Sequence, residues 1–332
     1  MKIAINGFGR IGRAVLKIAI DNPEIEIVAI NDLAELENLT YLLNYDTVYR
    51  IYKNKAEVKD GNLMVAGKQI KFFSAKNPAD LPWAELEIDL VVEATGFFTD
   101  RTGAEGHLKA GAKKVLISAP TKDETIKTIV CGVNNDKLEV SDDIISNASC
   151  TTNCIAPMMK VLEDKFGVEK SLMSTIHSYT STQSLVDGPS KKDMRRGRAA
   201  ACNVVPTSTG AALAATLVVP ELKGVFDGMA YRVPTPAGSI SDVVVLLKKD
   251  VTKEEITQAF EEAEAGSMKN ILQATTEPLV SSDILRSTYS VIVPTDLIKV
   301  VGGNLVKVVG WYDNEWGYSE RVIDLALKMN NK

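Results

Sequence analysis

The sequence predicts an α/β domain with a doubly wound, mostly parallel sheet, followed by an α+β domain with an antiparallel sheet. Three observations support this prediction. Strand and helix patterns alternate over the first half of the chain, glycines fill the first strand–helix junction, and strand-like runs dominate the second half. A chain of 332 residues also exceeds the roughly 250–300 residues at which single hydrophobic cores stop growing. Two domains are therefore expected.

The first half of the chain shows the alternation of strand and helix. Lys2 to Asn6 is a short apolar run, Arg13 to Ile20 has the 3.6-residue spacing of a helix, and Glu24 to Asn31 resembles a second strand. A right-handed crossover makes two such strands parallel. Further strands are expected at Asp89–Glu93, Lys114–Ile117, Ile129–Val133 and Asp143–Ile145, with helices at Ala34–Leu43 and His107–Ala112.

The pattern changes from about Thr151 onward. Long strand-like stretches with helices between them are typical of an α+β domain. We expect helices at Thr151–Phe166, Val251–Ala265 and Ser319–Met329, and strands at Leu172–Ile176, Gly228–Val233, Ser241–Leu247 and Leu305–Trp311. The segment Tyr179–Cys202 is polar, basic and aperiodic, so a long loop that carries function or an interface is expected there.

The composition is that of a globular protein of the cytoplasm. Apolar residues make up 45% of the chain, yet no apolar run approaches the roughly 20 residues that span a bilayer. Glycines and arginines interrupt the first 20 residues, which therefore fail as a signal peptide. The formal charge of −5 gives no overall electrostatic footprint for nucleic acid or anionic lipid. We expect neither membrane binding nor nucleic-acid binding as a main role.

A glycine-rich turn indicates a dinucleotide site. Gly7, Gly9 and Gly12, with Arg10 and Ile11 between the last two, fit the pattern G-x-G-x-x-G between a predicted strand and a predicted helix. Glycines at these positions permit the tight turn, the close approach of backbone to a pyrophosphate, and the packing of helix on strand. The free N–H groups and the dipole of the helix then attract the pyrophosphate. This context favours an α/β Rossmann domain over a glycine-rich turn without a ligand.

Asp32 indicates which cofactor binds. It lies 20 residues after Gly12, at the end of the second predicted strand, where a carboxylate can accept hydrogen bonds from ribose hydroxyls. The same carboxylate would repel the 2′-phosphate of NADP, and no lysine or arginine follows before Arg50. NAD is therefore expected. Asp32 could also, or instead, cap the following helix.

A thiol at a helix start is the expected nucleophile. Cys150 lies between a strand-like segment and an apolar helical run, with Ser149 and Thr151 available for capping. The helix N-terminus stabilises a thiolate and lowers the thiol pKa. Cys154 lies one turn further along and is expected to be a free thiol that faces inward. The remaining cysteines, Cys131 and Cys202, are interpreted as reduced, buried and structural, and no metal site is expected.

The chain contains two histidines, so few candidates for a catalytic base exist. His177 ends an apolar strand and precedes the long polar loop, a place where catalytic side chains are commonly mounted. A neutral imidazole there can take the proton of a nearby thiol. His107 falls in a polar helical segment and is expected to be solvated or to cap the helix.

Six ordered motifs then identify a family. The motifs are NGFGRIGR, SCTTNC, the segment around Arg195, PTSTGAA, YRVPTP and WYDNEWGYS, and together the chain resembles phosphorylating NAD-dependent glyceraldehyde-3-phosphate dehydrogenases from residue 2 to about 329. The resemblance implies a homotetramer of chains with an NAD-binding domain at 1–149, joined by a C-terminal helix at 315–332, and a catalytic domain at 150–314. It also implies that Cys150 attacks the aldehyde of glyceraldehyde 3-phosphate, that His177 is the base, and that inorganic phosphate cleaves the thioester, in glycolysis or gluconeogenesis.

The resemblance also assigns binding residues. It implies that Thr180, Arg195 and Arg232 hold the C3 phosphate of the substrate, and that Ser149, Thr151, Thr209 and Gly210 receive inorganic phosphate. Bidentate arginine, hydroxyl groups and free N–H groups suit phosphate chemically. Asn314 resembles the residue that binds the nicotinamide carboxamide, Tyr318 one that packs beside the ring, and Leu33 and Gly188-Pro189 resemble those of NAD-using members. Thr95 and Ser118 are expected to complete the cofactor site.

Some alternatives stay open. Arg196 and Arg198 could belong to the phosphate site, although a solvated basic loop is the preferred interpretation of Arg196. Erythrose-4-phosphate dehydrogenase is the alternative activity, because that branch shares the thiol and the fold. A protein that binds nucleic acid or another partner on the same scaffold is disfavoured by the acidic charge and by the intact Cys/His pair.

Overall fold

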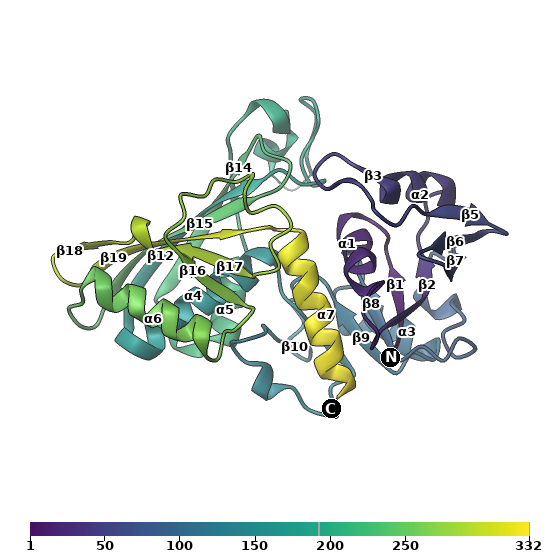
Figure 1. The fold of residues 1–332 in the computed structure, drawn as a ribbon, viewed down its shortest axis with the longest axis horizontal. Helices are drawn as coiled ribbons and strands as arrows, with labels where there is room; N and C mark the ends of the chain where they lie inside the picture. The colour runs from purple at the N-terminus through teal and green to yellow at the C-terminus, as the bar shows by residue number, and fades with distance from the viewer. Residues whose placement is uncertain (192, 332) are drawn as a thin grey trace. The chain divides into compact units, whose positions relative to one another are not determined.

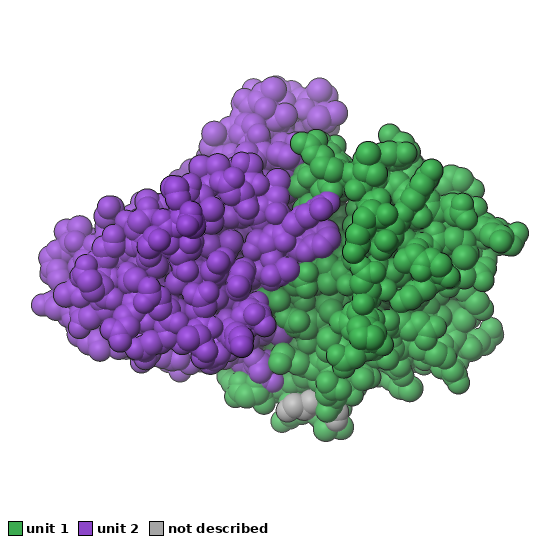
Figure 2. Space-filling model, viewed as in Figure 1, with its two compact units in different colours: residues 1–129, 136–148, 319–332 green, residues 130–135, 149–318 purple. Residues whose placement is uncertain are grey.

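The computed structural model describes residues 1–191 and 193–331 (Figure 1). Two compact units make up the chain, coloured separately in Figure 2: unit 1 comprises residues 1–129, 136–148 and 319–332, and unit 2 comprises residues 130–135 and 149–318. Each is built on one large sheet, mostly parallel in unit 1 and mixed in unit 2, which confirms the predicted fold class. Within the predicted loop 179–202 and the predicted helix 315–332, residues 192 and 332 lie outside the described residues.

Unit 1 contains a nine-stranded sheet in the order β10-β11-β9-β8-β1-β2-β7-β6-β5. Neighbouring strands from β10 to β7 are parallel, and β6 runs antiparallel to β7 and β5. The strands of this sheet are β1 (Lys2–Asn6), β2 (Glu26–Asn31), β5 (Glu57–Lys59), β6 (Asn62–Val65), β7 (Lys68–Phe73), β8 (Leu90–Glu93), β9 (Lys114–Ile117), β10 (Lys127–Thr128) and β11 (Ile144–Ser146). The strands β3 (Tyr45–Asp46) and β4 (Arg50–Ile51) pair in a separate two-stranded sheet. The helices are α1 (Arg10–Ala19), α2 (Leu36–Asn44) and α3 (Arg101–Lys109).

The order of these strands positions a ligand site. The chain runs from β1 outward through β2 to β7 and then returns to place β8 on the other side of β1. Ligands of open α/β sheets bind outside the carboxyl ends of the strands at such a reversal. The strands β8 and β9 are apolar and almost fully buried because both faces of the sheet are covered.

Unit 2 contains an eight-stranded sheet in the order β13-β14-β12-β15-β19-β17-β16, with β18 beside β19. The pairs β12–β14 and β16–β17 are parallel and the other pairs are antiparallel, so the sheet is largely antiparallel, as predicted, with two parallel pairs. The strands are β12 (Val168–Ser178), β13 (Val205–Ser208), β14 (Phe226–Val233), β15 (Ser239–Leu247), β16 (Leu272–Thr275), β17 (Val291–Pro294), β18 (Lys299–Val301) and β19 (Leu305–Tyr312). The helices of unit 2 are α4 (Cys150–Phe166), α5 (Ala211–Val218) and α6 (Lys253–Ala265), while α7 (Trp316–Asn330) starts at the end of unit 2 and belongs to unit 1 from Ser319 onward.

The two faces of the unit 2 sheet differ. The helix α4 packs against β12, β15, β17 and β19, and its side chains from Thr151 to Met159 are buried. Along β15, buried and less buried residues alternate, as expected when one face of a sheet is covered. On the other face, Leu172 and Val244 lie opposite each other on β12 and β15 and are 67% and 41% exposed.

Two of the elements predicted in the first half of the chain need correction. The predicted strand Ile129–Val133 is a turn that follows β10, because Gly132 has a φ of +82° and the side chain of Asn134 accepts the N–H of Val130. The predicted helix His107–Ala112 begins earlier, at Arg101, because Asp100 caps it by accepting the N–H of Gly103 at 2.8 Å. It ends before Gly111, whose φ is +103°.

Two side chains also differ from the predictions. His107 is fully buried rather than solvated, because α3 packs its inner face on the sheet. Cys202 is exposed rather than buried, because it lies at the end of the surface segment Tyr179–Cys202, which contains only short 3₁₀ turns (Met194–Gly197 and Ala200–Cys202) among its described residues. All four cysteines are free thiols, and Cys131 and Cys154 are buried as predicted.

The helices carry no sign of a membrane span. Over residues 1–191 and 193–331, none of them combines the length and the apolar character that crossing a bilayer requires.

Candidate active site

The glycine-rich turn has the geometry that an anion site needs. Gly7 has a φ of +94°, and a Cβ atom on it would lie 2.7 Å from the N atom of Thr95. A Cβ on Gly12 would lie 2.1 Å from the carbonyl oxygen of Gly7. Gly9, the N-cap of α1, faces open space, and among the described side chains none caps the helix start there. The start of α1 therefore lies beside open space at Gly9, where the helix dipole favours an anion.

The Asp32 carboxylate accepts a hydrogen bond from the glycine-rich turn and does not cap the following helix, α2. Its Oδ2 atom accepts the N–H of Phe8 at 2.7 Å, and its Oδ1 atom accepts the N–H of Ala34 at 2.9 Å. The N-cap of α2 is Glu35, so the alternative of Asp32 as that cap is wrong. The half-buried carboxylate of Asp32 lies beside the turn, and Leu33 next to it is 63% exposed.

Other predicted cofactor residues of unit 1 have partners in the protein. The guanidinium of Arg10 pairs with Asp46 and lies 5.4 Å from the centre of the Tyr49 ring. Thr95 follows β8, and Ser118 follows β9, where its N–H donates to the carbonyl of Glu93 at 2.9 Å. Both residues thus lie at the carboxyl end of the sheet.

Asn314 is held in one orientation in unit 2. Its Oδ1 atom accepts from Ser178 Oγ at 3.0 Å, from Ser239 Oγ at 3.1 Å and from the N–H of Gly238 at 3.1 Å. These donors fix the amide so that the Nδ2 group is the part that can donate to a ligand. Tyr318, in the first turns of α7, is 5% exposed.

The predicted thiol and base lie together in unit 2. α4 begins at Cys150, and Ser149 caps it by accepting the N–H of Thr152 at 3.0 Å. The Sγ atom of Cys150 lies 3.5 Å from the Nε2 atom of His177, near the end of β12. The Nδ1 atom of His177 lies 2.7 Å from the carbonyl oxygen of Ser178. An Nδ1–H donated to that oxygen leaves the Nε2 lone pair facing the sulfur.

Arg232 lies beside this pair because of the sheet register. His177 and Arg232 are opposite each other on the parallel strands β12 and β14. The Nη1 atom of Arg232 lies 2.6 Å from His177 Nδ1 and donates to the Ser178 carbonyl at 3.0 Å. A guanidinium can only donate, so its closeness to a protonated Nδ1 is unfavourable. An anion that attracts Arg232 would therefore favour the tautomer that a base requires.

Both groups of the pair are shifted toward their neutral forms. Burial raises the pKa of the Cys150 thiol, although the charge of Arg232, the hydroxyl of Thr151 and the backbone N–H groups at the helix start lower it. Burial lowers the pKa of His177 to about 3, with the charge of Arg232 acting in the same direction. The predicted effect of the helix start on the thiol is present, but desolvation outweighs it. Because the pKa of the thiol is raised, formation of a thiolate near neutral pH depends on transfer of the proton to His177.

A buried tyrosine that the sequence reasoning did not single out supports the site. The hydroxyl of Tyr312 lies 3.0 Å from Thr151 Oγ1 and 2.8 Å from Thr175 Oγ1, and its ring packs edge-on against His177 at 5.9 Å. Thr151 Oγ1 in turn lies 4.0 Å from Cys150 Sγ. Tyr312 is part of the motif WYDNEWGYS, which was the available signal.

The remaining predicted phosphate residues of unit 2 have local contacts of their own. Thr180 pairs with Thr182 at 2.9 Å between hydroxyl oxygens, Arg195 is exposed, Thr209 Oγ1 accepts the N–H of Ala211 at 3.2 Å, and Gly210 is the N-cap of α5. Among the described residues, no hydrogen bond joins these four to Cys150 or His177. The structure thus brings together Cys150, His177, Thr151 and Arg232, with Ser149 at the cap of α4. The hydrogen bonds of Thr180, Arg195 and Thr209 are made within their own segments.

The two other arginines of the long loop differ from each other. Arg196 donates from Nε to Thr207 Oγ1 at 2.8 Å and from Nη2 to the carbonyl of Ser208 at 3.3 Å, so the solvated interpretation of Arg196 is wrong. It ties the loop to β13. Arg198 pairs with Asp187 at 3.0 Å in an exposed ion pair.

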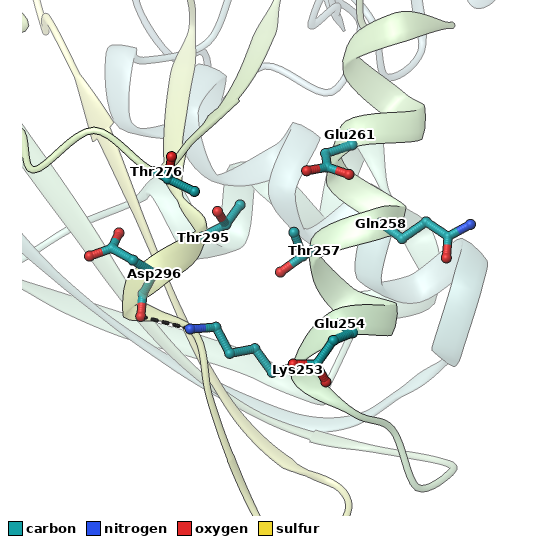
Figure 3. A pocket seen from close by; sticks show the side chains of 8 residues that line it. All are labelled: Lys253, Glu254, Thr257, Gln258, Glu261, Thr276, Thr295 and Asp296. Atoms are coloured by element: carbon teal, nitrogen blue, oxygen red, sulfur yellow. Dashed lines mark hydrogen bonds between the residues drawn. The ribbon is translucent and has the colours of Figure 1, made fainter.

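A groove along α6 does not belong to this site (Figure 3). Lys253, Glu254, Glu261, Thr295 and Asp296 are among its lining residues, and Lys253 Nζ donates to the carbonyl of Asp296 at 3.0 Å. Its three carboxylates do not suit a phosphate ligand. Within the described parts of the chain, no cluster of three or more His, Cys, Asp or Glu side chains could hold a metal ion.

The sheet reversal with its glycine-rich turn, together with the thiol–imidazole pair, defines an NAD-dependent oxidoreductase that acts through a cysteine. Comparison with protein families identifies it further. The model described as "Glyceraldehyde 3-phosphate dehydrogenase, NAD binding domain" matches residues 1–101, and that of the C-terminal domain of the same family matches residues 149–314. The chain belongs to the glyceraldehyde-3-phosphate dehydrogenase family and is an NAD-dependent enzyme.

Individual relatives agree with the family match. Glyceraldehyde-3-phosphate dehydrogenase 1 of Trichormus variabilis is 52% identical over 334 residues, which cover 100% of this chain and 97% of that protein. Glyceraldehyde-3-phosphate dehydrogenase 1 of Bacillus subtilis is 51% identical over 333 residues, and the protein of that family from Geobacillus stearothermophilus is 51% identical over 333 residues. In both cases 100% of this chain and 99% of the relative are covered.

Proposed function

We propose that this protein oxidises D-glyceraldehyde 3-phosphate to 1,3-bisphosphoglycerate with NAD and inorganic phosphate, through a thioester on Cys150, in glycolysis or gluconeogenesis. The observation that carries the proposal is the 3.5 Å separation of Cys150 Sγ and His177 Nε2 at the start of α4. A thiol at a helix start, with a base in hydrogen-bonding reach, is the arrangement that nucleophilic catalysis needs.

The residues of the pair account for each proton. Cys150 Sγ bonds to the aldehyde carbon as its proton passes to His177, which returns a proton to the new hydroxyl oxygen. The hydroxyl proton is given up again to His177 when the carbon is oxidised to the thioester. Bound NAD supplies the acceptor for the hydride. Attack of phosphate on the thioester carbon forms the acyl phosphate, breaks the C–S bond and restores the thiol with the proton held by His177.

Unit 2 contains the residues that we propose as partners for the phosphate groups of the reactants. In the proposal, Thr180, Arg195 and Arg232 hold the C3 phosphate, and Ser149, Thr151, Thr209 and Gly210 receive inorganic phosphate. The half-buried guanidinium of Arg232 and the hydroxyls around the start of α4 support this assignment. A phosphate on Arg232 would also relieve the contact of its guanidinium with Nδ1 of His177.

The NAD site is proposed at the carboxyl edge of the unit 1 sheet. Gly7, Gly9, Arg10, Ile11 and Gly12 would hold the pyrophosphate, Asp32 the ribose, and Thr95, Ser118, Asn314 and Tyr318 the remaining parts. The open space over Gly9 and the available Nδ2 group of Asn314 support the fit of the group. The carboxylate of Asp32 favours NAD over NADP.

Three further features are part of the proposal. The domain boundaries are placed at 1–149 with 315–332 and at 150–314, which the two compact units support. The protein is a homotetramer, which the exposed apolar residues Leu172 and Val244 support because monomers rarely expose such surface in quantity. It acts in the cytoplasm, on small molecules, without a main role at nucleic acid or membranes.

The test is turnover by two serine variants. Cys150→Ser should abolish NADH formation from glyceraldehyde 3-phosphate, NAD and phosphate while NAD binding persists, because a serine hydroxyl is a far weaker nucleophile than a thiolate. Cys154→Ser is the matched control and should keep most activity, since its thiol is buried and donates to the carbonyl of Gly310, away from the reacting atoms. Substantial turnover by Cys150→Ser contradicts the thioester. Equal rates with erythrose 4-phosphate would favour the alternative activity.

A further inference from the structure

A buried carboxylate, Glu93, lies where the proposed cofactor site meets the sheet, and the mechanism above does not use it. Glu93 ends β8 and lies opposite Asn6, the last residue of β1, so it sits at the reversal of strand order. Glu93 is 1% exposed. A buried carboxylate is costly unless several donors surround it. Its retention at this edge therefore needs an explanation.

Four donors converge on the two oxygens of Glu93. Oε2 accepts from Asn6 Nδ2 at 2.6 Å and from His107 Nε2 at 3.2 Å. Oε1 accepts from the N–H of Thr95 at 2.8 Å and from the Thr95 hydroxyl. One oxygen thus faces the protein interior, and the other holds the segment that follows β8.

The two interior donors, Asn6 and His107, are each held in one orientation. The indole N–H of Trp83 can only donate, and it donates a hydrogen bond to His107 Nδ1 at 3.0 Å. The imidazole proton of His107 therefore lies on Nε2 and points at Glu93. Asn31 Nδ2 donates to Asn6 Oδ1 at 2.7 Å, so the Nδ2 group of Asn6 also points at Glu93. Both orientations are set by residues that are themselves buried.

The segment held by Oε1 touches the glycine-rich turn. The Thr95 N atom lies 2.7 Å from the position a Cβ on Gly7 would take, and the N–H of Ala94 donates to the carbonyl of Asn6 at 2.7 Å. The backbone at Thr95 therefore forms one side of the space in which the turn is built. Any shift of Thr95 would move the turn or open a gap beside it.

We propose that Glu93 is a positioning residue for NAD: a buried carboxylate, oriented by Asn6 and His107, that fixes Thr95 against the glycine-rich turn before the cofactor binds. This inference rests on the proposed NAD site and adds to it the residues that hold it in shape. Cofactor affinity gains from a site that is already ordered, because less freedom is lost on binding.

The test is the dissociation constant of NAD, measured by calorimetry. In Glu93→Gln an amide NH₂ must face one of the two donor pairs, so the affinity for NAD should fall about tenfold or more. Thr95→Val, which lacks the hydroxyl, should also weaken NAD. If Glu93 acts through Thr95, the double variant should bind NAD about as weakly as the weaker single variant.

A matched control comes from the other end of the same strand. Asp89 precedes β8 and accepts the N–H of Lys2 at 2.7 Å, so Asp89→Asn also removes a charge that holds a neighbouring strand. It should leave the NAD dissociation constant unchanged. At saturating NAD, Glu93→Gln should keep kcat within a few-fold and should keep the alkylation rate of Cys150. If Glu93 only stabilised the fold, Glu93→Gln would lower the melting temperature without selectively raising the KM for NAD.

The outcomes distinguish failure of the positioning role of Glu93 from failure of the proposed NAD site. Wild-type NAD affinity in Thr95→Val means that the placement of NAD at Thr95 is wrong. Weakened binding in Thr95→Val with wild-type binding in Glu93→Gln overturns the positioning role alone. If Glu93→Gln does not fold, His107→Phe is the second variant, because it removes one donor to Glu93 and keeps an aromatic ring. It should lower the affinity for NAD, but by less than the loss expected for Glu93→Gln. Wild-type NAD affinity in His107→Phe contradicts the inference.

Discussion

Cys150 and His177 face each other at 3.5 Å, yet the surroundings of both disfavour charge. Desolvation raises the pKa of the thiol and lowers that of the imidazole, so each group depends on the other to become reactive. The helix start alone, on which the sequence argument relied, does not make the thiolate. The partner His177 is the decisive group.

The pH dependence of alkylation should show this. In His177→Asn, no base takes the thiol proton, and a raised thiol pKa means that thiolate is present only above the ordinary range near pH 8.5. Iodoacetamide labelling of that variant at pH 7 should be about 10²–10⁴-fold slower than in the unmodified protein and should rise steeply with pH. A variant that labels at the unmodified rate at pH 7 would show that His177 is not the base.

Asp32 should control the choice of cofactor. We expect NAD to be preferred over NADP by at least about tenfold in kcat/KM, which needs only about 1.4 kcal/mol. Asp32→Gly should narrow that ratio mainly by weakening NAD, because both the ribose contact and the hydrogen bond from the Phe8 N–H are lost. Asp32→Asn, which keeps an acceptor, separates the loss of charge from the loss of hydrogen bonds. Equal use of both cofactors by the unmodified protein contradicts this role.

Sequence reasoning found the residues whose chemistry is rare and missed those whose role is support. Two histidines and four cysteines left few choices for the base and the nucleophile. His107 was misjudged because its neighbours along the chain are polar, whereas its contacts, Trp83 and Glu93, come from other elements. Burial of a polar side chain depends on such partners, which no local pattern shows.

Among the elements, the strand–turn–helix unit at the N-terminus was predicted in its order, with one difference in its bounds. β1 was predicted with its observed bounds, and α1 begins three residues earlier than expected, at Arg10. The glycines explain the difference, because the first turn of α1 lies within the motif itself. Ile129–Val133 was apolar enough for a strand, but the positive φ of Gly132 turns the chain.

Two alanine substitutions in the turn should act differently. Gly12→Ala would place a Cβ 2.1 Å from the Gly7 carbonyl oxygen, so it should lower the melting temperature and abolish NAD binding. Gly9→Ala meets no atom within 4 Å in the protein, so stability should be kept. If NAD approaches there, its dissociation constant should still rise about tenfold or more. Thermal melts and NAD titrations of both variants check this; unchanged NAD affinity in Gly9→Ala would place the cofactor elsewhere.

For the whole molecule, the mass in solution should be four times the 36.0 kDa of the chain. Leu172 and Val244, opposite each other on the uncovered face of the unit 2 sheet, are expected to lie in an interface between copies. Leu172→Glu should shift the protein to smaller species, because an apolar interface does not accommodate an unpaired carboxylate. Val140→Glu, at a position that is 70% exposed in unit 1, is the control. The measurement is the sedimentation of both variants. A tetramer formed by Leu172→Glu would show that this face of the unit 2 sheet is not the interface between copies.

The sequence by itself determined the fold class, the family, the cofactor class and the catalytic pair. These depend on short-range patterns, on rare side chains and on motifs that can be recognised along the chain. Only the tertiary structure decided that Arg232 lies against His177, that Tyr312 supports Thr151, and that Glu93 is buried among four donors. Those contacts join residues from strands and helices far apart in sequence, and sheet register and packing, rather than local pattern, bring them together.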